Sequence, residues 1–248
     1  MNELTNLQKA AAKFLPQNAP EIVLQGIVRS SFINLIARTI GYLRNVAVAV
    51  LFGLSYQTDG LLMALPLLGI FLIFVNVFDS LGVPQLVKAR MQSEKEFKNL
   101  AGLLFTFTLA LGLLLSVLAI VLIDLVLIIP AGFGSQALES TKSPYVLLIP
   151  YLFSNFIFHH FGAVLRSQRR FTHYFLGELV ISIANFVSLV LGYYLVKDFR
   201  VIPASISLAH MLGALYMLYV GREFVHLRFY EVISSTTFPN LTVRQGSF

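Results

Sequence analysis

The sequence contains no cysteine and no tryptophan, and only 12% of its 248 residues are charged. Without cysteine, the chain forms no disulfide, binds no metal through thiolates and has no cysteine nucleophile. Without tryptophan, any aromatic belt at a membrane interface has to consist of tyrosine. A soluble domain usually carries about 25% charged residues. The low charge therefore speaks against a soluble enzyme core.

Hydrophobic residues make up 57% of the chain, and its mean hydropathy is +0.78. A helix needs about 20 apolar residues to cross a hydrocarbon layer of about 30 Å. We therefore expect an all-α polytopic membrane protein with six transmembrane helices that form one lobe. The six apolar runs are approximately Ile27–Leu54, Leu61–Phe78, Leu100–Ile129, Tyr145–Leu165, Phe175–Val196 and Ala204–Val220.

The flanking segments divide the chain into three parts. Residues 1–25 form a cytoplasmic tail, which is either a short amphipathic helix on the membrane surface or a loosely ordered segment. Residues 26–229 form the six-helix lobe, and residues 230–248 form a polar cytoplasmic tail. The segment Met1–Asn18 has no apolar core of signal-peptide length.

Lysine and arginine are unequally divided between the loops on the two sides. One side carries thirteen, the other carries three, and two lie inside the first apolar run. Positively charged loops stay in the cytoplasm, so both termini are predicted to lie inside a cytoplasmic (inner) membrane. The net charge of +6 does not indicate nucleic acid binding, because the cations sit at the ends of apolar runs rather than on one polar face.

Arg38 and Arg44 are the two cations inside the first run. A charge at the centre of a bilayer costs about 2.5–3.5 kcal/mol on insertion scales. The two residues are about 9 Å apart along a helix and about 120° apart around it. They either border a broad polar cavity or extend their stems toward water. In a cavity, two arginine forks favour an anionic ligand such as a lipid-linked pyrophosphate.

Other intramembrane polar residues give weaker signals. His159 and His160 are adjacent and point about 100° apart, which does not suit metal chelation. They are either proton-relay residues or interhelical hydrogen-bonding groups. Thr58 or Asp59 is expected to cap the second helix. We find no metal-ligand cluster, phosphate-binding glycine loop or hydrolase motif, so neither a cofactor nor an enzymatic activity is predicted.

The segment Ala37–Asp59, ARTIGYLRNVAVAVLFGLSYQTD, resembles the first helix of the MurJ/MviN lipid II flippases. This family belongs to the multidrug/oligosaccharidyl-lipid/polysaccharide exporter (MOP) superfamily. Asn45 departs from the family pattern, which has aspartate there, and Leu67–Val77 lacks the charges that the family has late in its second helix. The matching residues are Arg38, Gly41, Arg44, Phe52, Gly53, Thr58 and Asp59. Weaker matches are Val83–Pro84, Pro150–Tyr151, Gly162–Ala163 and Arg170–Phe171.

The resemblance implies that Arg38, Arg44 and Asp59 bind a substrate in a cationic cavity. Possible gating or relay residues are Asn45, His159, His160 and Glu178. The family has about fourteen helices, so this chain supplies one lobe and is either a fragment or a half-size protein that pairs.

The resulting hypothesis is a flippase lobe for a lipid II-like, polyprenyl-pyrophosphate-linked oligosaccharide in cell-wall peptidoglycan biosynthesis or polysaccharide export. The lobe would contact membrane lipid and act as a homodimer or with a partner membrane protein. The alternative is a non-transporting half-size lobe that acts as an assembly or regulatory partner.

Overall fold

The computed structural model describes residues 21–53, 55–129 and 135–225, and all regular structure in these ranges is helical. The α-helices are α2 (Val23–Phe52), α3 (Tyr56–Val77), α4 (Val83–Gln92), α5 (Glu94–Val121), α6 (Ile123–Val126), α7 (Ser135–Leu147), α8 (Ile149–Ser167), α9 (Phe171–Val196) and α10 (Val201–Val220). A π-helical segment η1 (Phe78–Gly82) joins α3 to α4, and a 3₁₀ turn η2 (Arg222–Phe224) follows α10.

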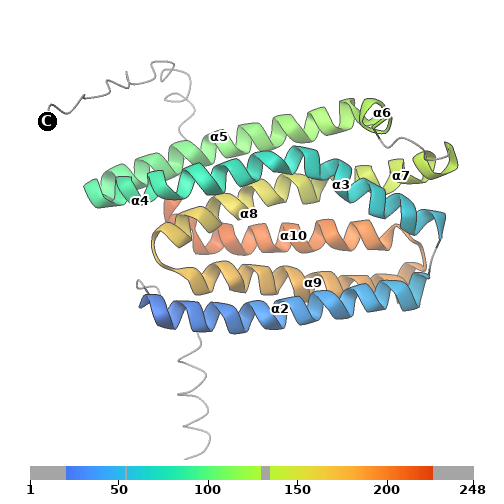
Figure 1. The fold of residues 1–248 in the computed structure, drawn as a ribbon, viewed down its shortest axis with the longest axis horizontal. Coiled ribbons are helices and arrows are strands. Elements are labelled where there is room, and N and C mark those ends of the chain that lie inside the picture. The colour runs from blue at the N-terminus through green and yellow to red at the C-terminus, as the bar shows by residue number, and fades with distance from the viewer. Residues whose placement is uncertain (1–20, 54, 130–134, 226–248) are drawn as a thin grey trace, which may run out of the picture.

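The described chain has five helices that are long and apolar enough to cross a membrane. They are α2, the continuous α3–η1–α4 unit, α5, α9 and α10. The pair Leu138–Leu147 and Ile149–Ser167, bent by 45°, makes a sixth when it is counted as one span. The predicted fold class, an all-α polytopic membrane protein with about six spans, is confirmed. Both ends of the described chain lie at the same end of the bundle, as an even number of crossings requires (Figure 1).

Two predicted span boundaries were wrong. The third helix ends at Val121 and not near Ile129, because the chain turns at Leu122 into the short α6. The fourth span does not begin at Tyr145, since helix already starts at Ser135 and is interrupted at Leu148. Pro150 stands in the first turn of α8. A proline has no N–H to donate and its ring displaces the preceding turn, which accounts for the break.

The start of α3 also differs from the expected cap. Ser55, rather than Thr58 or Asp59, precedes the helix, and its N–H donates to Thr58 Oγ1 at 2.7 Å. The Thr58 N–H donates to Ser55 Oγ at 3.3 Å, so the two residues satisfy each other's backbone donors. The preceding helix, α2, ends at Gly53, whose φ of 68° is favourable only for glycine. Leu54, residues 1–20 of the predicted N-terminal tail (1–25) and the predicted C-terminal tail (230–248) lie outside the described residues. Residues 23–25, which were assigned to the N-terminal tail, already belong to α2.

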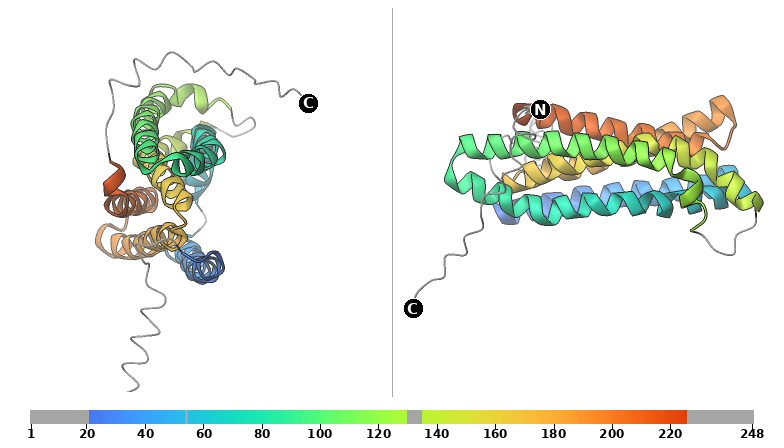
Figure 2. Two further views of the ribbon diagram at one scale, coloured as in Figure 1. Left: turned by 90° about the vertical axis from the view of Figure 1, so that its left-hand side faces the viewer. Right: turned by 90° about the horizontal axis from the view of Figure 1, so that it is seen from above.

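Helix α8 lies at the centre of the bundle (Figures 1 and 2). It packs mainly against α10 and α5, and α4, α3 and α9 also touch it. Phe156, Phe158 and Phe161 are almost completely buried there. Helix α2 lies at the edge and packs mainly on α9 (Figure 2). The core therefore forms around α8, and α2 is left with one broad unpacked face.

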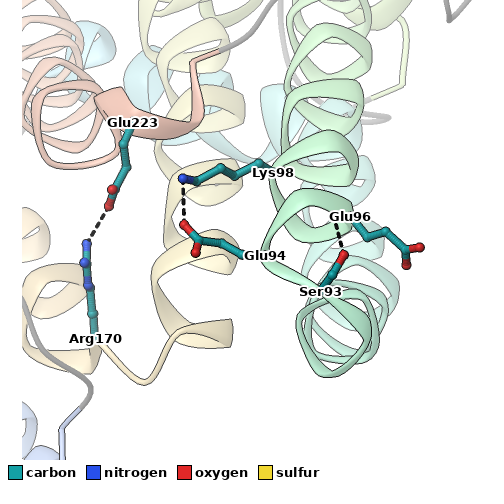
Figure 3. A network of polar contacts seen from close by, with 6 residues as sticks. All are labelled: Ser93, Glu94, Glu96, Lys98, Arg170 and Glu223. Atoms are coloured by element: carbon teal, nitrogen blue, oxygen red, sulfur yellow. Dashed lines mark hydrogen bonds and ion pairs between the residues drawn. The ribbon is translucent and has the colours of Figure 1, made fainter.

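Polar caps and ion pairs gather at the inner end of the bundle, which we define as the end where α9 begins and α10 finishes. Ser93 precedes α5 and accepts from the Glu96 N–H at 3.1 Å, and Lys98 pairs with Glu94 at 2.7 Å (Figure 3). The Ser93 hydroxyl is thus a side-chain N-cap, which satisfies a free donor at the start of α5.

Candidate functional site: a polar groove between α2 and α9

Helices α2 and α9 lie side by side, and a carboxylate fastens their inner ends. Glu21 Oε1 accepts from the Thr172 N–H at 3.2 Å, and the Glu21 N–H donates to the Arg169 carbonyl at 3.0 Å. The carboxylate is buried. The Glu21 carboxylate thus caps the first turn of α9 from another part of the chain, while Arg170 occupies the N-cap position itself.

A cavity of about 650 Å³ lies along this helix pair. Its lining residues recur three or four positions apart on each helix, which puts them on one face of that helix. From α2 these are Asn34, Ala37, Arg38, Gly41, Tyr42, Arg44 and Asn45, and from α9 they are Tyr174, Phe175, Glu178, Ser182 and Asn185. We call this cavity the α2–α9 groove. Most of its wall is polar although both helices are long enough to span a bilayer.

Both intramembrane arginines line the groove. Arg38 lies near the middle of α2 and is exposed, and its Nε donates to Asn34 Oδ1 at 3.3 Å. Arg44 donates from Nη1 to Asn45 Oδ1 at 3.0 Å. Among the described residues, the Nε and Nη2 atoms of Arg44 are buried and have no hydrogen-bond partner. A buried charged donor without a partner is costly, so the site is suited to an acceptor that the described chain does not provide.

The groove carries more positive than negative charge. Arg38 and Arg44 contribute two guanidinium groups, and Glu178 is the one carboxylate among the lining residues. Glu178 is half-buried. Two neighbours on α9 are already engaged, since Ser182 Oγ donates to the Glu178 carbonyl at 3.0 Å and Asn185 Oδ1 accepts from Ser205 Oγ at 3.1 Å. An anion therefore fits the groove better than a cation.

The remaining predicted site residues lie elsewhere. Asp59 is exposed in the first turn of α3 and is not among the groove-lining residues. His159 is half-buried beside the groove, with its ring centroid 6.5 Å from that of Tyr174. His160 points into the core, where its ring lies 5.3 Å from that of Phe105. The structure thus brings Arg38, Arg44, Asn45 and Glu178 together, and their roles, like those of Asp59 and the two histidines, remain predictions.

Sequence reasoning missed several residues of this region. Asn34 and Tyr42 line the groove, and the four-residue steps between Asn34, Arg38 and Tyr42 were a readable helical signal. His210 on α10 was also missed. Its ring packs edge-on against Tyr151 with the centroids 4.5 Å apart, and it interacts electrostatically with Arg44 and His159. No feature of the linear sequence connects His210 with the first helix.

No family model matches the chain. Two curated proteins are similar to it in sequence. The probable lipid II flippase MurJ of Rickettsia prowazekii is 25% identical over 193 residues, which cover 75% of this chain and 38% of the relative. The probable lipid II flippase MurJ of Buchnera aphidicola is 24% identical over 234 residues, which cover 90% of this chain and 43% of the relative. The chain is thus distantly homologous to these flippases and spans about two fifths of their length.

Solved structures match the fold. A MATE transporter in complex with MaL6 superposes with a TM-score of 0.68 at 18% identity, covering 86% of this chain and 50% of the transporter. A MOP superfamily transporter from Pyrococcus furiosus, described as having a binding pocket of reversed polarity, superposes with a TM-score of 0.68 at 18% identity. The match covers 86% of this chain and 48% of that transporter. The predicted resemblance and the single-lobe fold are confirmed. The matched proteins are transporters and not enzymes.

Proposed function

We propose that this multi-pass membrane chain, which has the fold of half a MOP-superfamily transporter and is distantly homologous to MurJ, is one lobe of a lipid-linked sugar flippase. Its substrate is a polyprenyl-pyrophosphate-linked oligosaccharide of the lipid II type, which crosses the cytoplasmic membrane through a cavity that includes the α2–α9 groove. Both chain termini face the cytoplasm. These assignments carry the role of the relatives over to this chain.

The observation that carries the proposal is the placement of Arg38 and Arg44 in one groove near the middle of a spanning helix. Each charge costs about 2.5–3.5 kcal/mol at the bilayer centre, so a groove that concentrates both is expensive without a counter-charge. Glu178 is the one carboxylate that lines the groove, so the lining carries one more positive than negative charge. A pyrophosphate can neutralise the remainder and can occupy the arginine forks with paired hydrogen bonds.

A second lobe is part of the proposal, because a groove on one face of a helix pair does not enclose a substrate. The relatives are more than twice as long as the matched segment. Exposed apolar residues on α2, including Leu35 at 62% and Val50 at 76%, leave a surface for a partner. A second copy related by a two-fold axis along the membrane normal would supply a parallel lobe. A separate membrane protein is the other candidate partner.

The test is transport of a labelled lipid-linked precursor by the full chain reconstituted in proteoliposomes. Substituting both residues, Arg38→Ala and Arg44→Ala, is expected to reduce transport to background. The charge-matched control is the double variant Lys95→Ala and Arg200→Ala, which removes two exposed cations outside the groove. Its transport should stay close to that of the unmodified chain. A well-folded double variant that still transports at the unmodified rate would refute the proposal.

A second candidate function is a non-transporting lobe that assembles with or regulates other membrane proteins. The exposed face of α2 favours it, since that face can bind a protein without enclosing a substrate. The mass of the purified chain in a native membrane mimetic, with its co-purified lipids identified, separates the two. A monomer that no lipid-linked precursor stabilises would favour this second function.

A further inference from the structure

A second cavity, of about 430 Å³, lies at the inner end of the bundle. It sits between the start of α9 and the end of α10, and none of its lining residues belongs to the α2–α9 groove. Its lining residues are Arg170, His173, Tyr219, Val220, Arg222 and Glu223. We call it the inner-end cavity. It does not depend on the proposed transport function.

The charges around the inner-end cavity form an alternating chain. Arg170 Nη1 donates to Glu223 Oε1 at 3.0 Å, and Lys98, which pairs with Glu94, also interacts electrostatically with Glu223 (Figure 3). Arg222 adds a further cation. Cations thus outnumber carboxylates, and Glu223 is the one acidic group that lines the cavity.

The residues that line the inner-end cavity differ in how much of each side chain is exposed. The Arg170 side chain is only 16% exposed and His173 only 7%. Tyr219 is 68% exposed, and the Arg222 guanidinium lies 5.3 Å from its ring centroid. Tyrosines at the ends of spanning helices lie at the depth of the lipid headgroups. The cavity therefore has a partly buried cationic floor and an open rim at the level where lipid phosphates occur.

We propose that the inner-end cavity binds a phosphate group, either of an anionic phospholipid headgroup or of a soluble phosphate. Arg170 and Arg222 hold the oxygens from two sides, since guanidinium forks match phosphate geometry. Partial burial strengthens these contacts, because salt and water screen them less than at an open surface. Glu223 competes with the phosphate for Arg170 and limits its affinity.

The proposal does not rely on the N-terminus of α9. At least one of its donors, the Thr172 N–H, is already bonded to Glu21, and we assign the attraction to the side chains of Arg170 and Arg222. This makes the proposal specific, because single charge substitutions of cavity residues should change binding in opposite directions.

The experiment measures binding of phosphatidylglycerol to the full chain in non-ionic detergent by native mass spectrometry, with phosphatidylcholine and inorganic phosphate as parallel probes. Arg222→Gln and Arg170→Gln should each weaken phosphatidylglycerol binding about tenfold or more, which is the loss of one charge-assisted hydrogen bond. Glu223→Gln should strengthen it, because Arg170 loses its competitor. Lys95→Gln removes an exposed cation near the start of α5, outside the cavity, and should change binding little.

The results distinguish a phospholipid headgroup from a soluble phosphate as the ligand of the cavity. Preference for phosphatidylglycerol over inorganic phosphate, with this variant pattern, assigns the cavity to a lipid headgroup. Equal or better binding of inorganic phosphate with the same pattern supports the site and assigns it to a soluble phosphate. Non-saturable binding, or equal weakening by Lys95→Gln and Arg222→Gln, would overturn the proposal in favour of general attraction to a basic surface. Arg222 is exposed, so its variant stays informative if Arg170→Gln fails to fold.

Discussion

Helix α2 is long and apolar enough to cross a bilayer by itself, and α8 belongs to the bent pair that counts as one span, yet the two helices have different surroundings. Thirteen of the 19 residues of α8 are buried, whereas only four of the 30 residues of α2 are. Helix α8 touches helices on several sides, and α2 packs mainly on α9. The centre of the bundle holds α8, and its margin holds α2 (Figure 2).

The two helices therefore differ in what they contribute: α8 contributes to the stability of the lobe, and α2 contributes polar residues to the candidate site. Inside a bilayer, helices associate through close packing rather than by escaping water, so the side chains of α8 hold the lobe together. The polar residues of α2 contribute little packing, and they gather in the α2–α9 groove instead. Substitutions in α8 should therefore lower the free energy of unfolding, and substitutions on the exposed face of α2 should leave it nearly unchanged.

The largest expected contrast is between two phenylalanines. Phe156 on α8 is 1% exposed and Phe32 on α2 is 54% exposed. Phe156→Ala should destabilise the lobe by about 3 kcal/mol, the lower end for a buried Phe→Ala change, because lipid is also an apolar environment. Phe32→Ala should cost far less. Unfolding in a titration of denaturing detergent measures both, and equal losses would contradict the comparison.

A smaller contrast uses two glycines. A Cβ on Gly162 of α8 would lie 2.7 Å from ring carbons of Tyr174, but a Cβ on Gly41 of α2 meets nothing within 4 Å. Gly162→Ala should destabilise the lobe by about 1–2 kcal/mol through overpacking. Gly41→Ala should be neutral or stabilising by up to about 1 kcal/mol, because alanine favours a helix. Thermal unfolding should occur at a lower temperature for Gly162→Ala and at an unchanged or higher temperature for Gly41→Ala.

The Glu21 cap should have an effect of about 1 kcal/mol, as is usual for an N-cap. Glu21→Ala removes the acceptor of the Thr172 N–H, so the first turn of α9 should fray. Glu21→Gln keeps an oxygen in that place and is the control. Hydrogen exchange at Thr172 measures the change, and unaltered exchange in the alanine variant would show that the cap is unimportant.

The smallest effect is expected at Asn34. Its Oδ1 accepts from Arg38 Nε at 3.3 Å, on an exposed part of the helix. Asn34→Ala should change the free energy of unfolding by less than about 0.5 kcal/mol, as surface changes usually do. A loss comparable with that of Gly162→Ala would mean that the groove also holds the lobe together.

The spans were predictable because length and hydropathy determine them before any helix packs. The arginines could also be identified, since their cost in a bilayer is independent of neighbouring helices. The break at Leu148 was hidden because the apolar run continues through it, and the end of α5 at Val121 was hidden for the same reason.

The set of residues that line the groove could not be predicted from the sequence, because it depends on how the helices pack. Arg38 and Arg44 diverge by about 120° on one helix, yet both line the same cavity because α9 forms its other wall. Adjacent histidines gave no indication that His160 enters the core while His159 stays beside Tyr174. Asp59 follows α2 closely in sequence, but it belongs to the first turn of α3 and does not line the groove.

The cap between Glu21 and Thr172 has a consequence for biosynthesis. The two residues are 151 positions apart, and a ribosome delivers helices to the membrane in chain order. Helix α2 thus enters the bilayer long before its main neighbour has been translated. Until then Arg38 and Arg44 lack the wall that α9 later provides. The arrival of α9 completes the wall of the groove, and the Glu21 cap can form only from that point on.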